Sequence, residues 1–541
     1  MEEKGGDVKL SFGGIKKNWT LIVLILILFI GFYFRVYHVD YPVVGYHNWK
    51  ETHYLTEARN FAEDGFFENG IFTPYRDYSE KSDNFSGTHT DSFPSTSIIV
   101  GFLFSIFGSS LFLARLTNIL LTLGSIVLVY SIFSLLFKRK NFALITAVIF
   151  AINPLSIFFG RQVQLINAAL FFCLLGVYFY IKWHKNGTAK NAFWFSFFLL
   201  LGILTKYSFI LFAIPILFTY PYRRIKEKKY FKQHATMAVL VILSFSWIKY
   251  ISSISHSIAQ QASFLDIGPA FTSAFWQTMI AYMKDNYTVL GVFLFLLGIF
   301  FWFFVVKVNK KSLGYKFMNA YFFGAVVWFF LMSGKLAGHN YHQYPLIPLF
   351  VFFTAFFVYS ISNIVAKMVG VRKAKWFFVL IILVILLIPS MQSKDRMFDT
   401  QFIGLDIAGD YVREHSSPDE KMIHSGHQDY GFIWHADREA VYDGVPSTED
   451  IIEAEEELNV RWIFLYQWGL NVMNEPQWEY ISQHYSLKQM AVTQSGGTAT
   501  PFYFLLEKGG SFDLEALTAT PPKTRTYEYS AGTRELLYFE I

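Results

Sequence analysis

The chain has 541 residues, of which 53% are hydrophobic and only 16% are charged, and Phe alone contributes 61 residues. Apolar stretches of about 20 residues span a bilayer, so this composition is typical of a polytopic membrane protein and not of a soluble globular one. The net charge of +5 is too small to indicate nucleic-acid binding, and a single cysteine, Cys173, excludes a disulfide framework.

The membrane spans are predicted from the apolar runs and from the Lys and Arg clusters. The first run ends near Tyr37 and lacks the small-residue cleavage site of a signal peptide, so we expect a retained span. The positive-inside rule places the basic clusters in the cytoplasm, namely residues 4–17, 138–140, 182–190, 223–232, 307–316 and 367–375. About eleven spans satisfy this rule, near residues 19–37, 116–137, 141–159, 166–183, 192–205, 207–221, 234–253, 288–307, 316–333, 344–361 and 376–390. The N-terminus is therefore expected in the cytoplasm and the C-terminus outside.

The apolar run 95–113 does not cross the membrane in this arrangement, because the cluster 138–140 would then face outward. We predict an interfacial or re-entrant helix that packs against protein on the outer face. The polar segment 38–94 becomes an external first loop, and a loop of this length is usually functional. Two short spans meet at Lys206, which indicates either a local dip in the outer surface or a lysine that snorkels from a helix end.

Composition changes after residue 390, where charged and polar residues dominate. Helical patterns at 402–415 and 448–458 alternate with strand-like runs at 421–426, 439–443, 460–466 and 501–508. About 150 residues suffice for one soluble domain. The sequence therefore predicts a mainly α, polytopic helical bundle of about eleven spans at 1–390 and an external α/β domain at 391–541.

The first loop contains the residues with the strongest potential for chemistry. HNWKETHYLTEARNF reads as an amphipathic helix with Trp49 on an apolar side and with Glu51 and Arg59 on a polar side, although an ordinary interfacial helix has the same pattern. Asp91 stands in DSFP at the end of the loop, where it is either functional or a turn carboxylate before proline.

Several loop residues are of metal-binding types, and these are His47, Glu51, His53, His89 and Asp91. Their spacing matches no metal motif such as HExxH, so a divalent metal ion is a weakly supported alternative, and no cofactor is firmly predicted.

Cations gather at the predicted outer ends of the spans. Arg115, Arg161, Lys206 and Lys335 lie there, and Arg59 lies in the loop beside them. Such a set can hold a lipid phosphate or pyrophosphate, although each member taken singly can be a snorkelling side chain. His339 and Tyr341 stand near the same interface, where a tyrosine belt is an alternative explanation for Tyr341.

Six segments in order along the chain carry a family resemblance. They are WKETHYLTEARNFAEDG, DSFP, FGSSLFLARLTNILLTLGSIVLVYSIFSLLFKRK, NPLSIFFGRQVQLINAALFF, LLLGILTKYSFILFAIPILF and HNYHQYPLIPLF. Their order and spacing over residues 15–360 resemble the GT-C superfamily of polytopic glycosyltransferases, which includes protein O-mannosyltransferases and lipid A aminoarabinose transferases. The resemblance implies an external catalytic first loop and a polyprenyl-phosphate sugar donor. It also implies an acceptor that reaches the site from outside or from the outer leaflet.

The chain departs from the family pattern at one position. Many relatives have an adjacent Asp-Glu pair in the first loop, where this chain has Lys50 followed by Glu51. Either Glu51 or Asp91 is therefore expected to act as the base. The oligosaccharyltransferase branch is not favoured, because its WWDYG-type motif is absent.

These observations predict a multi-pass cell-membrane enzyme that moves a sugar from a dolichyl or undecaprenyl phosphate to a protein, glycan or lipid outside the cytoplasm, with inversion at the anomeric carbon. The expected catalytic residues are Asp91 and Glu51. The expected ligands of the donor phosphate are Arg59, Arg115, Arg161, Lys206, Lys335, His339 and Tyr341, supported by His47 and His89. A lipid-linked sugar flippase is the alternative, but it favours ionisable groups at mid-membrane and inverted repeats, whereas these charges lie at one face.

Overall fold

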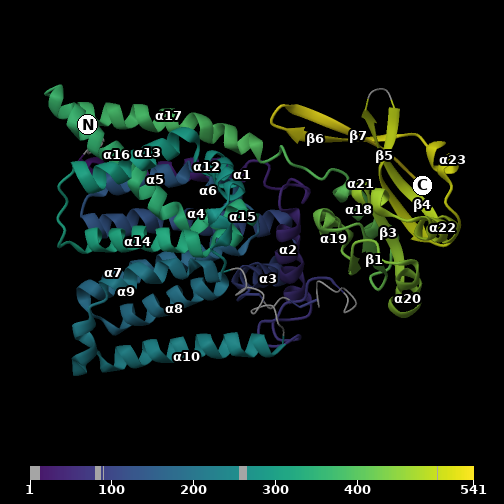
Figure 1. Ribbon diagram of the computed structural model, residues 1–541, viewed down its shortest axis with the longest axis horizontal. Helices are drawn as coiled ribbons and strands as arrows, with labels where there is room; N and C mark the ends of the chain where they lie inside the picture. Colours follow the sequence, from purple (N-terminus) through teal and green to yellow (C-terminus); the bar gives the residue numbers. More distant parts are fainter. Residues whose placement is uncertain (1–12, 79–86, 89–90, 255–264, 496–497) are drawn as a thin grey trace, which may run out of the picture.

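The computed structural model describes residues 13–78, 87–88, 91–254, 265–495 and 498–541. A bundle of long helices lies at one end, and a sheet with its own helices lies at the other (Figure 1). The bundle comprises α1 (Gly13–Val36), α4 (Leu111–Phe137), α5 (Lys140–Ala151), α6 (Pro154–Phe159), α7 (Leu165–Asn186), α8 (Ala189–Thr205), η1 (Tyr207–Phe212), α9 (Ala213–Thr219), α10 (Phe231–Ile254), α12 (Ser273–Tyr287), α13 (Val289–Phe300), η5 (Phe301–Val305), α14 (Leu313–Leu331), α15 (Ser333–Gly338), η6 (Asn340–Leu346), α16 (Ile347–Met368) and α17 (Ala374–Arg396). Short 3-10 turns η2 (Tyr222–Lys226), η3 (Lys228–Tyr230) and η4 (Gly268–Phe271) connect some of these helices.

Six of the described helices are long and apolar enough to cross a membrane, or seven if one bent pair counts as a single span. The bent pair is α12 with α13–η5, which meet at an angle of 98°. Other predicted spans form shorter or broken helices. The predicted span 141–159, for example, is split between α5 and α6, where Pro154 cannot continue the hydrogen-bond ladder of α5. The protein is a multi-pass membrane protein, and the count of about eleven spans stays a prediction.

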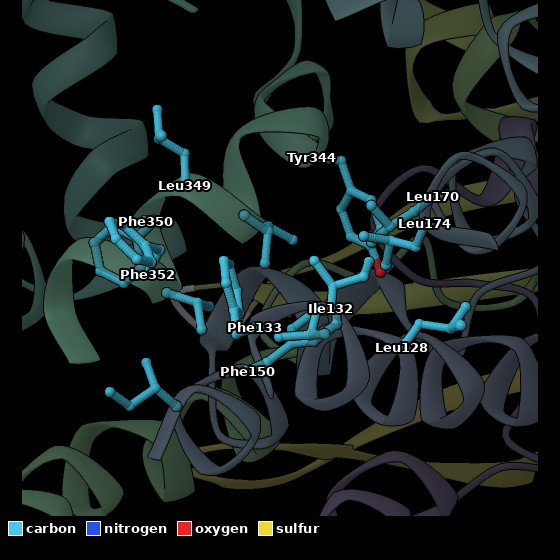
Figure 2. Packing of buried hydrophobic residues seen from close by; sticks show 14 of the residues in the cluster. Leu128, Ile132, Phe133, Phe150, Leu170, Leu174, Tyr344, Leu349, Phe350 and Phe352 are labelled. Carbon is cyan, nitrogen blue, oxygen red and sulfur yellow. The ribbon is translucent and has the colours of Figure 1, made fainter. Parts of the chain in front are cut away.

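The bundle core is made by aromatic and aliphatic side chains of α4, α5, α7 and α16. Figure 2 shows Phe133 of α4 and Phe352 of α16 among the packed side chains, and their ring centroids are 5.4 Å apart. Tyr344 of η6 is fully buried in the same cluster, and its hydroxyl donates to Asn167 Oδ1 of α7 at 2.8 Å. Apolar packing and one buried hydrogen bond thus join η6, which carries part of the site, to the centre of the bundle.

The first loop forms α2 (Asn48–Glu63) and then α3 (Ser95–Phe107), which pack on each other. The predicted non-crossing helix 95–113 ends earlier than expected, because Gly108 with φ 82° stops α3 and residues 111–113 already belong to the long helix α4. The close packing of α2 on α3 needs Gly101, since a Cβ there would lie 2.9 Å from the Ala58 carbonyl oxygen.

The sequence of α2 has the predicted amphipathic pattern, but the helix does not have the exposed polar side that this pattern predicts. Both faces of the helix are covered, and even Glu51 and Arg59 are at most 5% exposed. Leu55 and Ala58 pack with residues of α3, and Glu51 pairs with Arg115 of α4. Trp49 instead packs in the apolar cluster of the sheet domain, so α2 is a buried element between two parts of the protein.

The C-terminal part contains a sheet with strand order β2-β1-β3-β5-β4-β7-β6 among the described residues. The strands are β1 (Lys421–His424), β2 (Ala440–Asp443), β3 (Val460–Tyr466), β4 (Tyr485–Ser495), β5 (Thr498–Lys508), β6 (Lys523–Tyr529) and β7 (Gly532–Glu540). Only the pairs β1–β2 and β1–β3 are parallel. The predicted helices correspond to α18 (Leu405–His415) and α20 (Thr448–Leu458), and the strand-like runs to β1, β2, β3 and β5.

The two faces of this sheet are covered by different elements. One face packs against α20, α22 (Glu475–His484) and α23 (Leu514–Thr518). The other face packs against α18, α19 (Gly431–Ala436) and the first loop, which contributes Val44, Trp49 and Tyr78 to the same apolar cluster. The turn η7 (His427–Asp429) and the helix α21 (Gln467–Val472) complete the domain.

Backbone hydrogen bonds fasten the first loop to the domain. The Ala440 N–H donates to the Asp77 carbonyl oxygen at 2.9 Å, and the Phe402 N–H donates to the Val44 carbonyl oxygen at 2.7 Å. Asn48, at the start of α2, donates to the Gln428 carbonyl oxygen at 2.8 Å. The first loop is therefore a shared layer between the bundle and the sheet domain.

Candidate functional site

A cavity of about 230 Å³ lies where the first loop meets the bundle. It is lined by residues of α2, of the segment before α3, of the α8–η1 junction, and of α15 and η6. We call it the lysine cavity, because Lys50, Lys206 and Lys335 line it together with Asp91, the one carboxylate among its described lining residues. Its lining also includes the aromatic and imidazole side chains of Trp49, Tyr54, Tyr207, His339, Tyr341 and His342.

Chain breaks bring these lysines to the cavity. Lys206 is the C-cap residue of α8, and its extended backbone separates α8 from η1, so its side chain leaves the bundle at a helix end. Lys335 lies in the one-and-a-half-turn helix α15, which follows the end of α14 at Met332. Asp91 comes three residues before Pro94, the N-cap residue of α3. Each of these ionisable groups therefore lies at an interruption between helices, where charge costs less than in the middle of a span.

Aromatic rings hold two of the lysines. The Lys50 ammonium lies 4.2 Å from the ring centroid of Trp49, and the Lys206 ammonium lies 5.8 Å from that of Tyr341. Both distances are within the range of cation–π attraction. These contacts hold the ammonium groups in the cavity without neutralising them.

The lysines also act on one another. Burial and the neighbouring Lys206 lower the pKa of Lys50 to about 7, although Asp91 acts in the opposite direction. The same causes lower the pKa of Lys335 to about 8. Burial, Lys50 and Lys206 lower the pKa of His339 to about 4, so this histidine is neutral at pH 7. The cavity is electropositive, and an anionic ligand would relieve the repulsion among its lysines.

Two polar atoms in the wall of the cavity have no hydrogen-bond partner among the described residues. They are Nδ1 of His342, a residue that is only 7% exposed, and the hydroxyl of Tyr207. Buried polar atoms are nearly always satisfied in folded proteins, so a pair of such atoms in one cavity indicates a place for a polar ligand or water.

Five of the residues predicted from the sequence line this one cavity, and they are Asp91, Lys206, Lys335, His339 and Tyr341. His47 stands behind it, with ring centroids 5.1 Å from His339 and 5.3 Å from Tyr341. His47 is the N-cap residue of α2 in a left-handed conformation with φ 62°. Burial and His339 hold its pKa well below the ordinary value. His89 lies outside the described residues.

Glu51 does not line the cavity. Its carboxylate accepts two hydrogen bonds from Arg115, at 2.9 and 2.8 Å, and a third from the Val163 N–H at 3.1 Å. Burial by itself raises the pKa of this carboxyl, but Arg115 and the Val163 N–H bring it below the ordinary value. Arg115 also donates to the carbonyl oxygens of Val39 and Tyr41. The geometry favours a structural role for the pair, because both groups are occupied in joining the first loop to α4.

Two further predicted phosphate ligands lie elsewhere. Arg59 pairs with Asp77 of the loop and with Asp437 of the sheet domain, each at 2.5 Å. Arg161 donates to the carbonyl oxygens of Tyr37 and His38 at 2.7 and 2.6 Å. The sequence predicts that two or three of the five cations line one cavity, and among the described residues Lys206 and Lys335 line this one. Their role as phosphate ligands stays a prediction.

Among the lining residues that the sequence did not single out as site residues are Trp49, Lys50, Tyr54 and His342. Lys50 had been noted only as a substitution for the aspartate of relatives. That substitution was the available signal, because a lysine in place of a carboxylate changes the charge of the site. Trp49 and Tyr54 are explained equally well in a sequence by apolar packing, so their position could not be inferred.

The sheet domain covers the start of α2. His427 of η7 packs on Trp49 with ring centroids 4.3 Å apart, and Trp49 in turn carries the Lys50 ammonium. A buried hydrogen bond of 3.1 Å between the Tyr78 hydroxyl and His424 Nε2 lies nearby, and His424 contacts Asp429 at 2.6 Å. The domain thus fixes the first turn of α2 from above, and with it one wall of the cavity.

The described residues contain no cluster of three or more His, Cys, Asp or Glu side chains that is able to hold a metal ion.

The family model that matches the chain is described as dolichyl-phosphate-mannose-protein mannosyltransferase, and it matches residues 91–248, less than a third of the sequence. No curated protein matches the chain. Among solved structures, ArnT from Cupriavidus metallidurans bound to undecaprenyl phosphate is 11% identical with a TM-score of 0.57, over 92% of this chain and 98% of that one. An Archaeoglobus fulgidus oligosaccharyltransferase in complex with Zn and sulfate is 12% identical with a TM-score of 0.52, over 89% of this chain and 73% of that one.

A third similar structure is the mycobacterial arabinofuranosyltransferase AftD, which is 10% identical with a TM-score of 0.52, over 92% of this chain but only 40% of that one. These matches confirm the predicted resemblance to the GT-C superfamily. They also confirm a fold in which a polytopic helical bundle is followed by a C-terminal sheet domain. At these identities the structural matches establish the fold and leave the donor, the acceptor and the residue roles to the site itself.

Proposed function

We propose that this protein, which has the GT-C fold, transfers a sugar from a polyprenyl phosphate to an acceptor on the outer side of the membrane. The lysine cavity holds the donor phosphate, and Asp91 acts as the base. The observation that supports this most directly is the convergence of Lys50, Lys206, Lys335 and Asp91 on one cavity at the end of the bundle. Transfer of a sugar from a lipid phosphate to a hydroxyl requires two features of the site. These are cations that bind the phosphate and a nearby carboxylate that acts as the base.

The reaction moves one proton and breaks one bond. The acceptor hydroxyl gives its proton to the Asp91 carboxylate as its oxygen attacks the anomeric carbon. The bond between that carbon and the phosphate oxygen breaks, and its electron pair stays with the leaving phosphate. Attack from the face opposite the leaving group inverts the configuration at the anomeric carbon.

The lysines matter most when the bond breaks. A sugar–phosphate diester carries one negative charge, and the departing monoester gains a second as the bond breaks. Three cationic side chains around that group stabilise the added charge more strongly than water does, because the cavity is partly shielded from solvent.

The arrangement of the ends of the bundle supports the proposed orientation. In Figure 1 the helix α1 begins at the end of the bundle away from the sheet. The α9–α10 and α16–α17 connections lie at the same end. The basic segments 223–232 and 367–375 belong to these two connections. The positive-inside rule therefore assigns that end to the cytoplasm and the lysine cavity with the sheet domain to the outer side. The comparisons give no support to the alternative of a lipid-linked sugar flippase.

Binding of undecaprenyl phosphate to the full-length protein tests the proposal. In nanodiscs we expect saturable binding by the wild type and at least a tenfold loss in the double variant Lys206→Gln, Lys335→Gln. Lys284→Gln, an exposed lysine outside the cavity, is the matched control. Binding that is equal in all three proteins would contradict a phosphate site in the lysine cavity.

A further inference from the structure

A second cavity, of about 380 Å³, lies beside the lysine cavity. Its wall is made by Tyr46 and Phe158, by Tyr282, Asp285 and Asn286 of α12, by Asn340, and by Arg396 and Asp399 at the end of α17. We call it the acidic cavity. Its volume lies in the range of small-molecule sites, about 300–1,000 Å³. In Figure 1 the elements α6 and α12 stand at the end of the bundle nearest the sheet domain.

The two cavities are adjacent, because neighbouring residues of two short segments line both. Tyr46 lines the acidic cavity, while Trp49 and Lys50 line the lysine cavity. In the second segment, Asn340 lines the acidic cavity, whereas His339 and Tyr341 line the lysine cavity.

The buried ring of His47 stands between these segments. It lies 3.9 Å from Tyr46 and 5.1 Å from His339, measured between ring centroids. The wall between the two cavities is therefore about one side chain thick.

The acidic cavity is unsuited to a second phosphate. Its carboxylates, Asp285 and Asp399, outnumber its single cation, Arg396. Arg396 lies 3.7 Å from Asp285, and both side chains are 64% exposed, so this pair is a weak surface contact that a ligand can replace. A neutral molecule with several hydroxyl groups fits such a wall, because carboxylates accept and the guanidinium donates hydrogen bonds.

The shape of the cavity favours a sugar ring over an extended peptide. Its residues come from five separate places in the chain and converge around one space, instead of following a line along a strand or groove. The aromatic side chains of Tyr46, Phe158 and Tyr282 offer apolar faces beside the polar groups, and a sugar has an apolar face and a hydroxyl edge to match.

We propose that the acidic cavity is the acceptor subsite and that it takes a neutral, hydroxyl-rich sugar unit. This inference rests on the proposed function, since an inverting transfer needs the acceptor on the far side of the sugar from the leaving phosphate. The acceptor then binds on the His47 side of the transferred sugar, and the donor phosphate stays with the lysines.

Ligand-observed NMR on the full-length protein in nanodiscs tests the subsite. The probes are the methyl glycosides of mannose, glucose, galactose and arabinose, and a threonine-containing tripeptide amide serves as the competing class. We expect saturable binding of at least one glycoside by the wild type, and about tenfold weaker binding by Asp285→Asn and by Arg396→Gln. Lys284→Gln, adjacent to Asp285 but outside the cavity, should bind as the wild type does.

Undecaprenyl phosphate binding in the same proteins separates the two proposals. The acidic-cavity variants should keep it, and the double variant Lys206→Gln, Lys335→Gln should lose it while it keeps glycoside binding. Glycoside binding that is absent, or unaffected by Asp285→Asn and Arg396→Gln, overturns the subsite alone. Binding of the peptide in place of the glycosides overturns the sugar assignment. Glycoside binding without any undecaprenyl phosphate binding overturns the proposed function and leaves a sugar site in place.

Discussion

The lysine cavity and the acidic cavity share a wall but have opposite charge. Three lysines face one carboxylate in the first, and two carboxylates face one arginine in the second. A site for a departing phosphate needs excess positive charge, whereas a site for a neutral acceptor needs hydrogen-bonding groups of both kinds. The difference indicates how the two proposed substrates are kept apart at one end of the bundle. The anionic donor is repelled by the carboxylates of the acidic cavity, and the neutral acceptor gains little binding energy from the lysines.

The largest expected effect is on turnover, and it concerns Asp91. If Asp91 is the base of the lysine cavity, Asp91→Asn should lower sugar transfer by about a hundredfold or more, because general base catalysis contributes on that scale. Transfer of radiolabelled sugar from the polyprenyl-phosphate donors of a membrane extract measures it. Asp419→Asn, an exposed carboxylate of the sheet domain that lines neither cavity, is the control. Near-normal transfer by the Asp91 variant would move the base out of the lysine cavity and towards the carboxylates of the acidic one.

The second effect is on donor affinity and separates the lysines from the arginines. Single Gln substitutions of Lys206 or Lys335 should each weaken undecaprenyl phosphate binding by about tenfold, because each removes one charge-assisted hydrogen bond. Arg161→Gln should leave that binding within about twofold, since its guanidinium is engaged with the carbonyl oxygens of Tyr37 and His38. The opposite ranking, measured by titration in nanodiscs, would place the phosphate away from the lysine cavity.

A smaller effect is expected from pH. Lys50 and Lys335 have pKa values lowered to about 7 and about 8, so both lose their protons as the pH rises from 6 to 9. A bound phosphate favours the protonated lysines, and undecaprenyl phosphate affinity should therefore fall by about fivefold or more over this range. No lysine is among the described residues that line the acidic cavity. Its affinity for glycosides should therefore stay nearly constant between the same pH values.

The variant Lys50→Arg provides the matched test of that pH dependence. Its guanidinium stays charged throughout the range, so the part of the affinity change that is due to Lys50 should disappear. A pH profile that is identical in the wild type and in this variant would show that Lys50 does not contribute to phosphate binding.

The smallest effect on activity is expected at Glu51. Its carboxylate is held by Arg115 and the Val163 N–H, so Glu51→Gln should change turnover of the folded protein by less than about threefold. Loss of a buried ion pair should instead lower the free energy of unfolding by about 3 kcal/mol, which thermal denaturation in detergent measures. A hundredfold fall in turnover without loss of stability would return the catalytic role to this residue.

The class of the protein and its helical bundle could be predicted from the sequence, because bilayer thickness acts on local composition. The order of six loose motifs was enough to indicate the superfamily. The membership of the site was only partly predictable. Lys206 interrupts an apolar run where charge is costly, and so it was recognisable, while Asp91 was one of two candidate bases that local sequence could not separate.

Tertiary structure decided the rest, since hydrogen-bond partners come from distant parts of the chain. Glu51 and Asp91 are both acids of one loop, but Arg115 of α4 and the Val163 N–H engage the first, while Lys206 and Lys335 share a cavity with the second. Arg59 looked like a phosphate ligand until Asp437, 378 positions later in the numbering, was seen to pair with it. Charge type and interruption of a span are properties of the local sequence; whether a charge is neutralised depends on long-range packing, and only the folded chain determines that.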